Sequence, residues 1–136
     1  MKRMIILLFF VLVFLIAGHF PLSASSSTNE FVSIENAHCY PNPFKNEKQI
    51  AKIKFIVKSD IQNDDSTVSV IIFDFNGKKV WTKSLGQMNI PPNTEFVVKW
   101  GGENDLGDKV ANGLYFCKII VEANNTIYKV IKILVK

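Results

Sequence analysis

Short runs of alternating or β-branched residues recur from Phe31 to the end of the chain, and no stretch there keeps a helical period for several turns. The clearest run follows Ile50 and places its apolar side chains on one face, opposite lysines. The apolar members are Ala51, Ile53, Phe55 and Val57. A period of two is expected when one side of a strand is buried. The pattern therefore predicts an all-β chain.

Turn signals separate these runs along the whole chain. The expected turns are a polar segment over residues 59–66, a tight hairpin at Asn76-Gly77 before a strand over residues 79–82, a longer loop from Gly86 with Pro91 and Pro92, a loop over residues 101–112, and Asn124-Asn125. About seven short strands with turn signals every 8–12 residues are typical of a β-sandwich and not of a βαβ protein.

The N-terminal segment has the layout of a secretory signal. Lys2 and Arg3 supply a basic start, residues 4–17 are unbroken apolar sequence, and residues 18–21 break it before small residues. We predict cleavage near residues 24–26, which makes 1–26 the signal peptide, 27–36 a linker with the start of the first strand, and 37–136 one sandwich. The apolar run is short for a membrane span, which needs roughly 20 residues, and a retained anchor reaching to Phe20 is the alternative.

The charge balance argues against nucleic acid as a partner. The chain has 16 Lys and Arg residues against 12 Asp and Glu, and Lys2 and Arg3 of the predicted signal account for half of the excess. The other basic residues stand singly along the strands, whereas a nucleic-acid surface clusters them on one stripe. We expect a protein partner, membrane contact only through the signal segment, and a secreted or cell-envelope location.

The chain has two cysteines, Cys39 and Cys117, and an exported chain could join them in one disulfide. Alternation in the last hairpin places Cys117 on the same face as Tyr115 and Ile119, which we interpret as the inward face. If Tyr40 also points inward, Cys39 points outward and cannot meet Cys117. Two free thiols, one of them a small buried apolar side chain, are therefore favoured, and the bridge is the alternative.

Three segments carry a resemblance to a known family. They are Tyr40-Pro41-Asn42-Pro43-Phe44, residues 70–80 with the sequence VIIFDFNGKKV, and residues 100–115 with the sequence WGGENDLGDKVANGLY. In this order and spacing they resemble the immunoglobulin-like module shared by the flagellar hook-capping protein and the type A C-terminal sorting domains of type IX secretion. The resemblance implies an immunoglobulin-like β-sandwich of about seven strands. Gly101 departs from the family, in which an acidic or amide residue usually follows the tryptophan.

The same segments have a physical interpretation of their own. Pro41 and Pro43 fix φ near about −65° and favour extended neighbours, so this strand belongs at a sheet edge. We expect Tyr40 and Phe44 to anchor the core. We also expect Trp100 to pack under the loop that follows it, where glycines and Asn or Asp residues favour sharp turns.

The strongest candidate for a metal site is the oxygen-rich part of that loop, which contains Glu103, Asn104, Asp105 and Asp108. Calcium takes several carboxylate and carbonyl oxygens as ligands. The spacing does not match a helix-flanked calcium loop, however, and Asp, Asn and Gly are also the residues that turns use. We therefore expect an ordinary turn, with no metal and no other cofactor.

Candidates for catalysis are few. His38 stands beside Cys39, but a Cys–His nucleophile also needs an orienting partner and a cleft. Asp64 and Asp65 are neighbours in the predicted polar turn, where they point apart and lack the burial that tunes a catalytic acid. We predict no catalytic residue and no enzyme activity.

These patterns predict an exported, non-catalytic module that acts through protein–protein contact, to which the resemblance adds secretion, sorting or cell-surface attachment. Only residues 25–36 precede the module, which is hardly a passenger to deliver, so a free-standing sandwich or a remnant of a larger secreted protein fits better. The alternative is a secreted carbohydrate-binding or enzyme-accessory domain. Trp81 and Trp100 could then form a sugar platform, although we expect them to pack instead.

Overall fold

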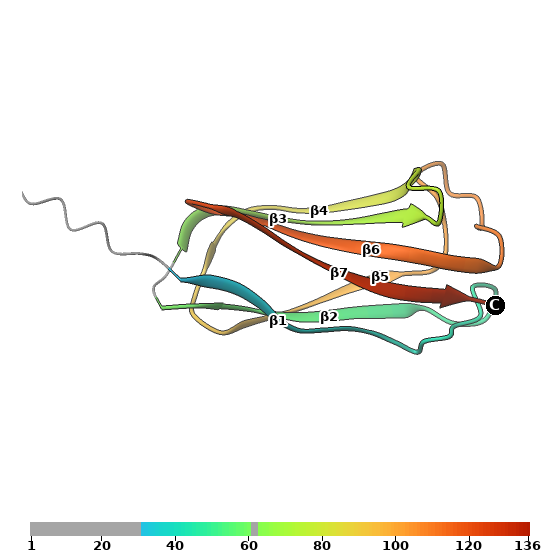
Figure 1. Cartoon of the computed structure of the whole chain (residues 1–136), viewed down its shortest axis with the longest axis horizontal. Coiled ribbons are helices and arrows are strands. Elements are labelled where there is room, and N and C mark those ends of the chain that lie inside the picture. The colour runs from blue at the N-terminus through green and yellow to red at the C-terminus, as the bar shows by residue number, and fades with distance from the viewer. Residues whose placement is uncertain (1–30, 61–62) are drawn as a thin grey trace, which may run out of the picture.

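The computed structural model describes residues 31–60 and 63–136, and this part of the chain forms seven strands (Figure 1). They are β1 (Val32–Tyr40), β2 (Ala51–Ser59), β3 (Asn63–Asp74), β4 (Lys79–Ile90), β5 (Thr94–Trp100), β6 (Gly113–Glu122) and β7 (Thr126–Val135). The predicted signal peptide lies outside the described residues. Within the described residues, no helix has the length and apolar character needed to cross a membrane.

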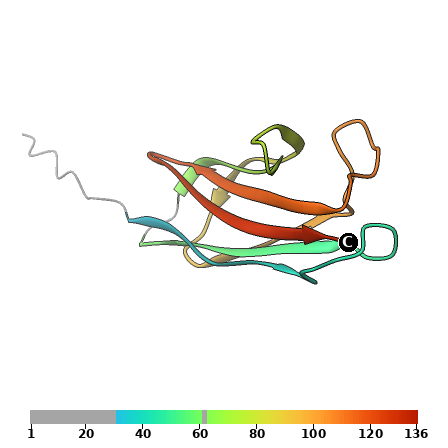
Figure 2. The ribbon, with the colours of Figure 1, turned by 45° about the vertical axis from the view of Figure 1, so that its right-hand side comes forward.

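The strands form two antiparallel sheets that lie face to face, as the two layers in Figures 1 and 2 show. One sheet has the order β1-β2-β5 and the other the order β4-β3-β6-β7. The buried apolar side chains of both sheets meet between the layers and form one core. The all-β, seven-strand sandwich is therefore confirmed. Pro41 and Pro43 lie after the end of β1, in a segment that is not a strand, and Phe44 at its end forms a single bridge with Val135 of the edge strand β7.

Strand β2 shows how the sequence pattern becomes a core. Ala51, Ile53, Phe55 and Val57 are all buried, while Lys52 and Lys58, which alternate with them, are exposed. Successive side chains of a strand point to opposite faces, so the alternation gives one apolar and one charged side. The predicted half-buried strand is confirmed.

Tyr40 was expected in the core, but it is 69% exposed, whereas Phe44 is fully buried as predicted. The reason is a bulge in β1 at Asn36, which has φ 52° and lies where the pairing with β2 shifts register. Ile34 points inward before the bulge. Because the bulge adds one residue, every later side chain of β1 points to the face opposite to the one that strict alternation predicts. Cys39 therefore packs against the core in the place where Tyr40 was expected.

Two strands are longer than the sequence predicted. β3 begins at Asn63, inside the polar turn expected over residues 59–66, and β4 runs to Ile90, through the loop expected from Gly86. The β3–β4 pairing shifts register near Asp65, with φ 57°, and near Gly86, with φ 83°. Bulges absorb these residues and the ladder continues, so residues typical of turns do not end either strand.

Candidate functional site

The loop of residues 101–112 lies at one end of the sandwich, where the sequence placed its strongest candidate for a metal. Trp100 leads into it and is 1% exposed. Its ring packs edge-on against Phe44 and Tyr115, with centroids 5.4 and 5.8 Å away, and its Nε1–H donates to the backbone oxygen of Glu103 at 2.8 Å. The expectation that Trp100 packs under this loop is confirmed.

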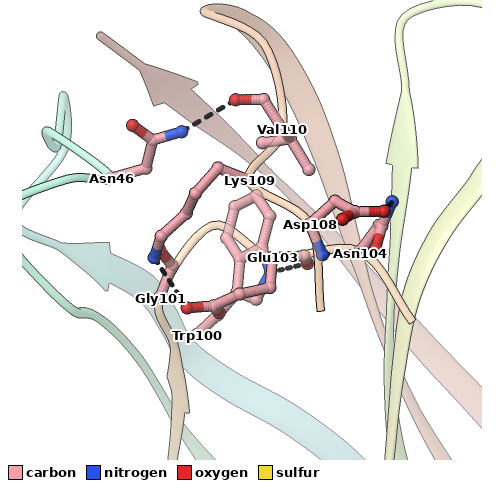
Figure 3. Close-up of polar contacts among 8 residues, drawn as sticks. All are labelled: Asn46, Trp100, Gly101, Glu103, Asn104, Asp108, Lys109 and Val110. Atoms are coloured by element: carbon pink, nitrogen blue, oxygen red, sulfur yellow. Dashed lines mark hydrogen bonds and ion pairs between the residues drawn. The ribbon is translucent and has the colours of Figure 1, made fainter. Parts of the chain in front are cut away.

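The polar side chains inside the loop hold the loop itself, as Figure 3 shows for several of them. The Asn104 Oδ1 accepts hydrogen bonds from the backbone N–H groups of Leu106 and Asp108, both at 2.9 Å. The Lys109 ammonium lies 2.7 Å from Glu103 Oε1, and this hydrogen bond holds the pKa of the Glu103 carboxyl below its usual value. These contacts are the ones that favour Asn and Asp in turns.

Three hydrogen bonds join the loop to other parts of the sandwich and fix its position. The Asp105 N–H donates to the Val80 oxygen at 2.9 Å, and the Asp105 carboxylate accepts from the Thr82 N–H at 2.8 Å, both on β4. On the other side, the buried Asn46 donates through Nδ2 to the Val110 oxygen at 2.8 Å (Figure 3). The loop thereby supplies hydrogen-bond partners to backbone groups of β4, which is an edge strand and has no neighbouring strand on that side.

A depression of about 370 Å³ opens between this loop and the β3–β4 turn. Asp74, which lines it, accepts the backbone N–H groups of Asn76 and Lys78 at 2.9 Å, so it closes the hairpin predicted at Asn76-Gly77. The Tyr115 hydroxyl donates to the Ala111 oxygen at 2.8 Å, and burial followed by the charge of Asp74 raises the Tyr115 pKa. The polar groups around the depression thus stabilise local structure.

The structure does not bring the other sequence candidates together into a reactive or metal-binding group. Among the described residues, no cluster of three or more His, Cys, Asp or Glu side chains is placed to hold a metal. His38 is exposed, and its Nδ1 lies 2.7 Å from the backbone oxygen of Asn36. Asp65 is exposed, and the side chain of Asp64 lies outside the described residues. Trp81 is half-buried against the core, as expected of a packing residue.

Both cysteines are free thiols, one on each sheet. The sequence argument against a bridge has a wrong premise, because Cys39 packs against the core and does not point outward. Cys117 is fully buried in β6, and Cys39 is partly buried in β1. Burial raises the pKa of Cys39 to about 11, and burial with the neighbouring Cys39 raises that of Cys117 to about 12. Thiols held in the protonated form are poor nucleophiles.

The outward side of the four-stranded sheet is a feature that the sequence reasoning missed. Its inward positions on β3, β6 and β7 are core residues such as Val70, Ile119 and Ile133, so the residues between them point outward. Many of these are apolar. They are Ile71, Phe73, Leu114, Phe116, Ile120, Tyr128, Val130 and Leu134. We call this set the apolar outer face.

Members of the apolar outer face are neighbours across the strands. In the register of the sheet, Phe73 stands beside Phe116, Ile120 beside Tyr128, and Leu114 beside Leu134. Directly opposed side chains on adjacent strands lie about 4.5–5.5 Å apart at Cβ, so the set is contiguous. Four of its members, Leu114, Tyr128, Val130 and Leu134, are exposed.

The outward side of the three-stranded sheet has the opposite character. Its β2 and β5 positions carry mainly charged side chains, and two ion pairs cross it, Lys54–Glu95 at 3.3 Å and Lys58–Glu35 at 3.7 Å. An antiparallel sheet that faces water on one side normally alternates in this way. The sandwich therefore has one polar and one apolar outer face.

The sequence contained a signal for this difference. β2 alternates lysines with apolar residues, but β6 reads LYFCKIIV over residues 114–121 and β7 reads IYKVIKILV over residues 127–135. Near-continuous apolar runs of this length are typical of strands that are covered on both sides. Counting both faces of each strand, instead of identifying the inward one alone, would have shown that β6 and β7 are apolar on both sides, although the order of the strands in the sheet comes from the structure.

Comparisons with known proteins find the fold and no closer relationship. No family model matches the chain, and no curated protein matches it. Among solved structures, dimeric latent PorU from Porphyromonas gingivalis is 21% identical with a TM-score of 0.55 over 78% of this chain. The C-terminal domain of Wzt is 13% identical with a TM-score of 0.56, and the match covers 79% of this chain and 77% of that one. FlgD from P. aeruginosa is 18% identical over 68% of this chain, with a TM-score of 0.49.

The chain corresponds to 9% of the PorU chain and to 64% of the FlgD chain. At these identities the PorU and Wzt matches, which have TM-scores above 0.5, show a shared β-sandwich and leave function open. The fold that the family resemblance implied is thus supported.

Proposed function

We propose that the chain is an exported, non-catalytic β-sandwich module that acts through protein–protein contact, as a secretion, sorting or cell-surface attachment domain. The observation that carries this proposal is the apolar outer face. A contiguous apolar patch on a soluble domain marks a surface that another molecule covers. The charged outer side of the three-stranded sheet provides the contrast within the same molecule.

The roles of the polar side chains support a contact function over a catalytic one. The side-chain oxygens of Asn104 and Asp105 accept hydrogen bonds from backbone N–H groups, and Glu103 forms an ion pair with Lys109. A general acid, base or nucleophile needs a shifted pKa and a partner within reach of a substrate. The raised pKa values of the two thiols act in the wrong direction for nucleophilic chemistry.

The family resemblance supports the narrower part of the proposal. The segments around Tyr40, Gly77 and Trp100 follow the order of the type A sorting domains and the hook-capping module. Both kinds of module act through contacts with other proteins, which agrees with a covered apolar outer face.

A photo-cross-linking experiment tests the proposal with a matched control. Val130 lies on the apolar outer face and is 46% exposed, and Val97 lies on the opposite outer side and is 47% exposed. A photo-reactive residue is placed at either position, and the chain is produced in the organism that makes it naturally. We expect discrete protein adducts from position 130 and none from position 97.

Equal labelling at both positions, or no protein adduct at either, would contradict the proposal. The alternative, a secreted carbohydrate-binding or enzyme-accessory domain, predicts a different result. It requires binding on a glycan array, or activity in a hydrolase screen, that is lost when the responsible surface is changed. The same purified protein serves both measurements.

A further inference from the structure

We infer that the partner covering the apolar outer face is a protein surface that combines apolar side chains with an excess of Asp and Glu. The inference rests on the proposed function, because it names the chemistry of the partner in that same contact. The observation that motivates it is the charge on the face. Lys118 on β6 and Lys132 on β7 stand among the apolar residues, and both point outward.

Lys118 lies on β6, inside the apolar outer face, and Lys132 lies on β7, the edge strand of the sheet, between Val130 and Leu134. In the register of the sheet, Lys118 stands between Ile71 and Val130, and Lys132 stands beside Phe116. The Lys118 ammonium lies 4.3 Å from the centre of the Tyr128 ring, so the charge rests over the apolar surface. A partner that covers the apolar residues must therefore also cover these ammonium groups.

Neither lysine has a carboxylate partner among the described residues, where the ion pairs involve other lysines. The acidic residue on the outward side of β6 is Glu122, at the end of the strand. Covering an unpaired ammonium removes its hydration and is unfavourable unless the covering surface supplies an opposite charge. Carboxylates on the partner, opposite Lys118 and Lys132, would supply it and would also favour this partner over others.

The same charges argue against a second copy of the chain as the occupant. A two-fold symmetric pair joins the same patch on both copies, so the lysines of one copy would meet an equally basic surface. Like charges that face each other across an interface weaken the association. Glu122 alone cannot compensate two lysines on each copy.

The shape of the face favours a protein over a membrane. Ile71, Phe73 and Phe116 are half-buried between their neighbours, so their side chains do not protrude and the middle of the face is flat. A flat apolar surface can pack against the surface of another protein at the density of a protein interior. Membrane binding instead requires apolar side chains that enter the acyl boundary of the bilayer.

The test combines the cross-linker at position 130 with charge reversal. We compare Lys118→Glu/Lys132→Glu with Lys52→Glu/Lys99→Glu, which makes the same change of net charge on the outward side of the three-stranded sheet. Because close charge pairs across an interface are worth at least roughly tenfold in affinity, we expect the adduct yield to fall at least tenfold in the first variant and to persist in the second. Mass spectrometry should map the adducts to a protein segment in which Asp and Glu outnumber Lys and Arg.

Three outcomes overturn the inference while leaving the contact function in place. They are an unchanged protein adduct yield in Lys118→Glu/Lys132→Glu, protein adducts that map to a basic or uncharged surface, and adducts that join two copies of this chain. Binding of the purified protein to phosphatidylglycerol vesicles but not phosphatidylcholine vesicles, lost in the same variant, would assign the face to a membrane and also overturn the inference. The absence of protein adducts from position 130 in the parent chain is a separate result that removes the proposed function itself.

Discussion

Trp100 joins the core to the loop that follows it, because its ring is buried and its N–H is bound to a loop carbonyl. Replacing a buried tryptophan by alanine typically costs about 3–5 kcal/mol, and small domains have a total stability of roughly 5–15 kcal/mol. We expect Trp100→Ala to yield little folded protein. Trp100→Phe keeps an aromatic ring but loses the hydrogen bond, which contributes about 0.5–1.5 kcal/mol in addition to the packing change.

Urea unfolding of Trp100→Phe measures this loss, with Trp81→Phe as the control. Trp81 is half-buried against the same core, and its indole N–H forms no hydrogen bond within the described residues. The control should therefore lose less stability. If Trp100→Ala unfolds like the parent chain and fails only in binding, Trp100 belongs to an interaction site and not to the core.

The Glu103–Lys109 ion pair predicts a dependence on pH. The folded pKa of Glu103 is lowered chiefly by its hydrogen bond to Lys109, so the pair stabilises the fold above the unfolded pKa of Glu103 and loses this effect as the pH falls through the folded value. Both side chains are more than a third exposed, and such pairs contribute less than about 1 kcal/mol. We expect Glu103→Gln to lower the melting temperature slightly at pH 7.

The same comparison at strongly acidic pH provides the control for Glu103→Gln. Once Glu103 is protonated, the parent and the variant carry the same charge in the loop, so their melting temperatures should converge. High salt at pH 7 should also narrow the difference because it screens an exposed ion pair. A difference that is independent of both pH and salt would show that Glu103 acts through packing and not through its charge.

At the level of elements, Gly102 is the point where the loop of residues 101–112 meets the segment before β2. Gly102 has φ 81°, and a Cβ at this position would overlap the Cβ of the buried Asn46. Gly107 has φ 93° with open space around it. Gly102→Ala therefore adds a steric clash to the backbone strain, whereas Gly107→Ala adds the strain alone.

We expect Gly102→Ala to be destabilised by at least about 1 kcal/mol more than Gly107→Ala, which corresponds to the low end of overpacking costs. Chemical denaturation of both variants gives the two free energies of unfolding. Equal losses in the two variants would mean that the backbone moves to relieve the clash, and that Asn46 does not fix the loop.

The elements with one buried side could be predicted from sequence, because strict alternation as in β2 specifies both the strand and its inward face. The bulges at Asn36 and Asp65 could not be predicted, since a single residue with positive φ leaves no periodic signal and yet reverses every later side chain. The inward turn of Cys39 in place of Tyr40 follows from the first of these bulges.

The candidate site illustrates the same limit. The loop after Trp100 was identified correctly as a turn, because Asn, Asp and Gly have local reasons to be there. The apolar outer face depends on which strands are neighbours, and the sequence does not state the order β4-β3-β6-β7. Its apolar residues become one surface only through this order.

At the scale of the whole molecule, the apolar outer face and its lysines have opposite effects on self-association. The apolar side chains favour a face-to-face pair of copies, since burying apolar surface contributes about 25 cal/mol for each Å² removed from water. Lys118 and Lys132 oppose that pair, because a two-fold arrangement brings the lysines of both copies close together. The balance between the two effects should depend on salt, which screens charges but leaves apolar contacts intact.

We therefore predict that the purified chain, without its predicted signal, is monomeric at low ionic strength and associates as the salt concentration rises. The Debye length is about 10 Å at 0.1 M salt and about 3 Å at 1 M, so high salt removes most of the repulsion between lysines near the surface. Lys118→Ala/Lys132→Ala should associate already at low salt, and Val130→Glu should remain monomeric at every salt concentration. Sedimentation velocity measures each case. Association that is strongest at low salt would instead mean that opposite charges join the copies, and that these two lysines do not hold them apart.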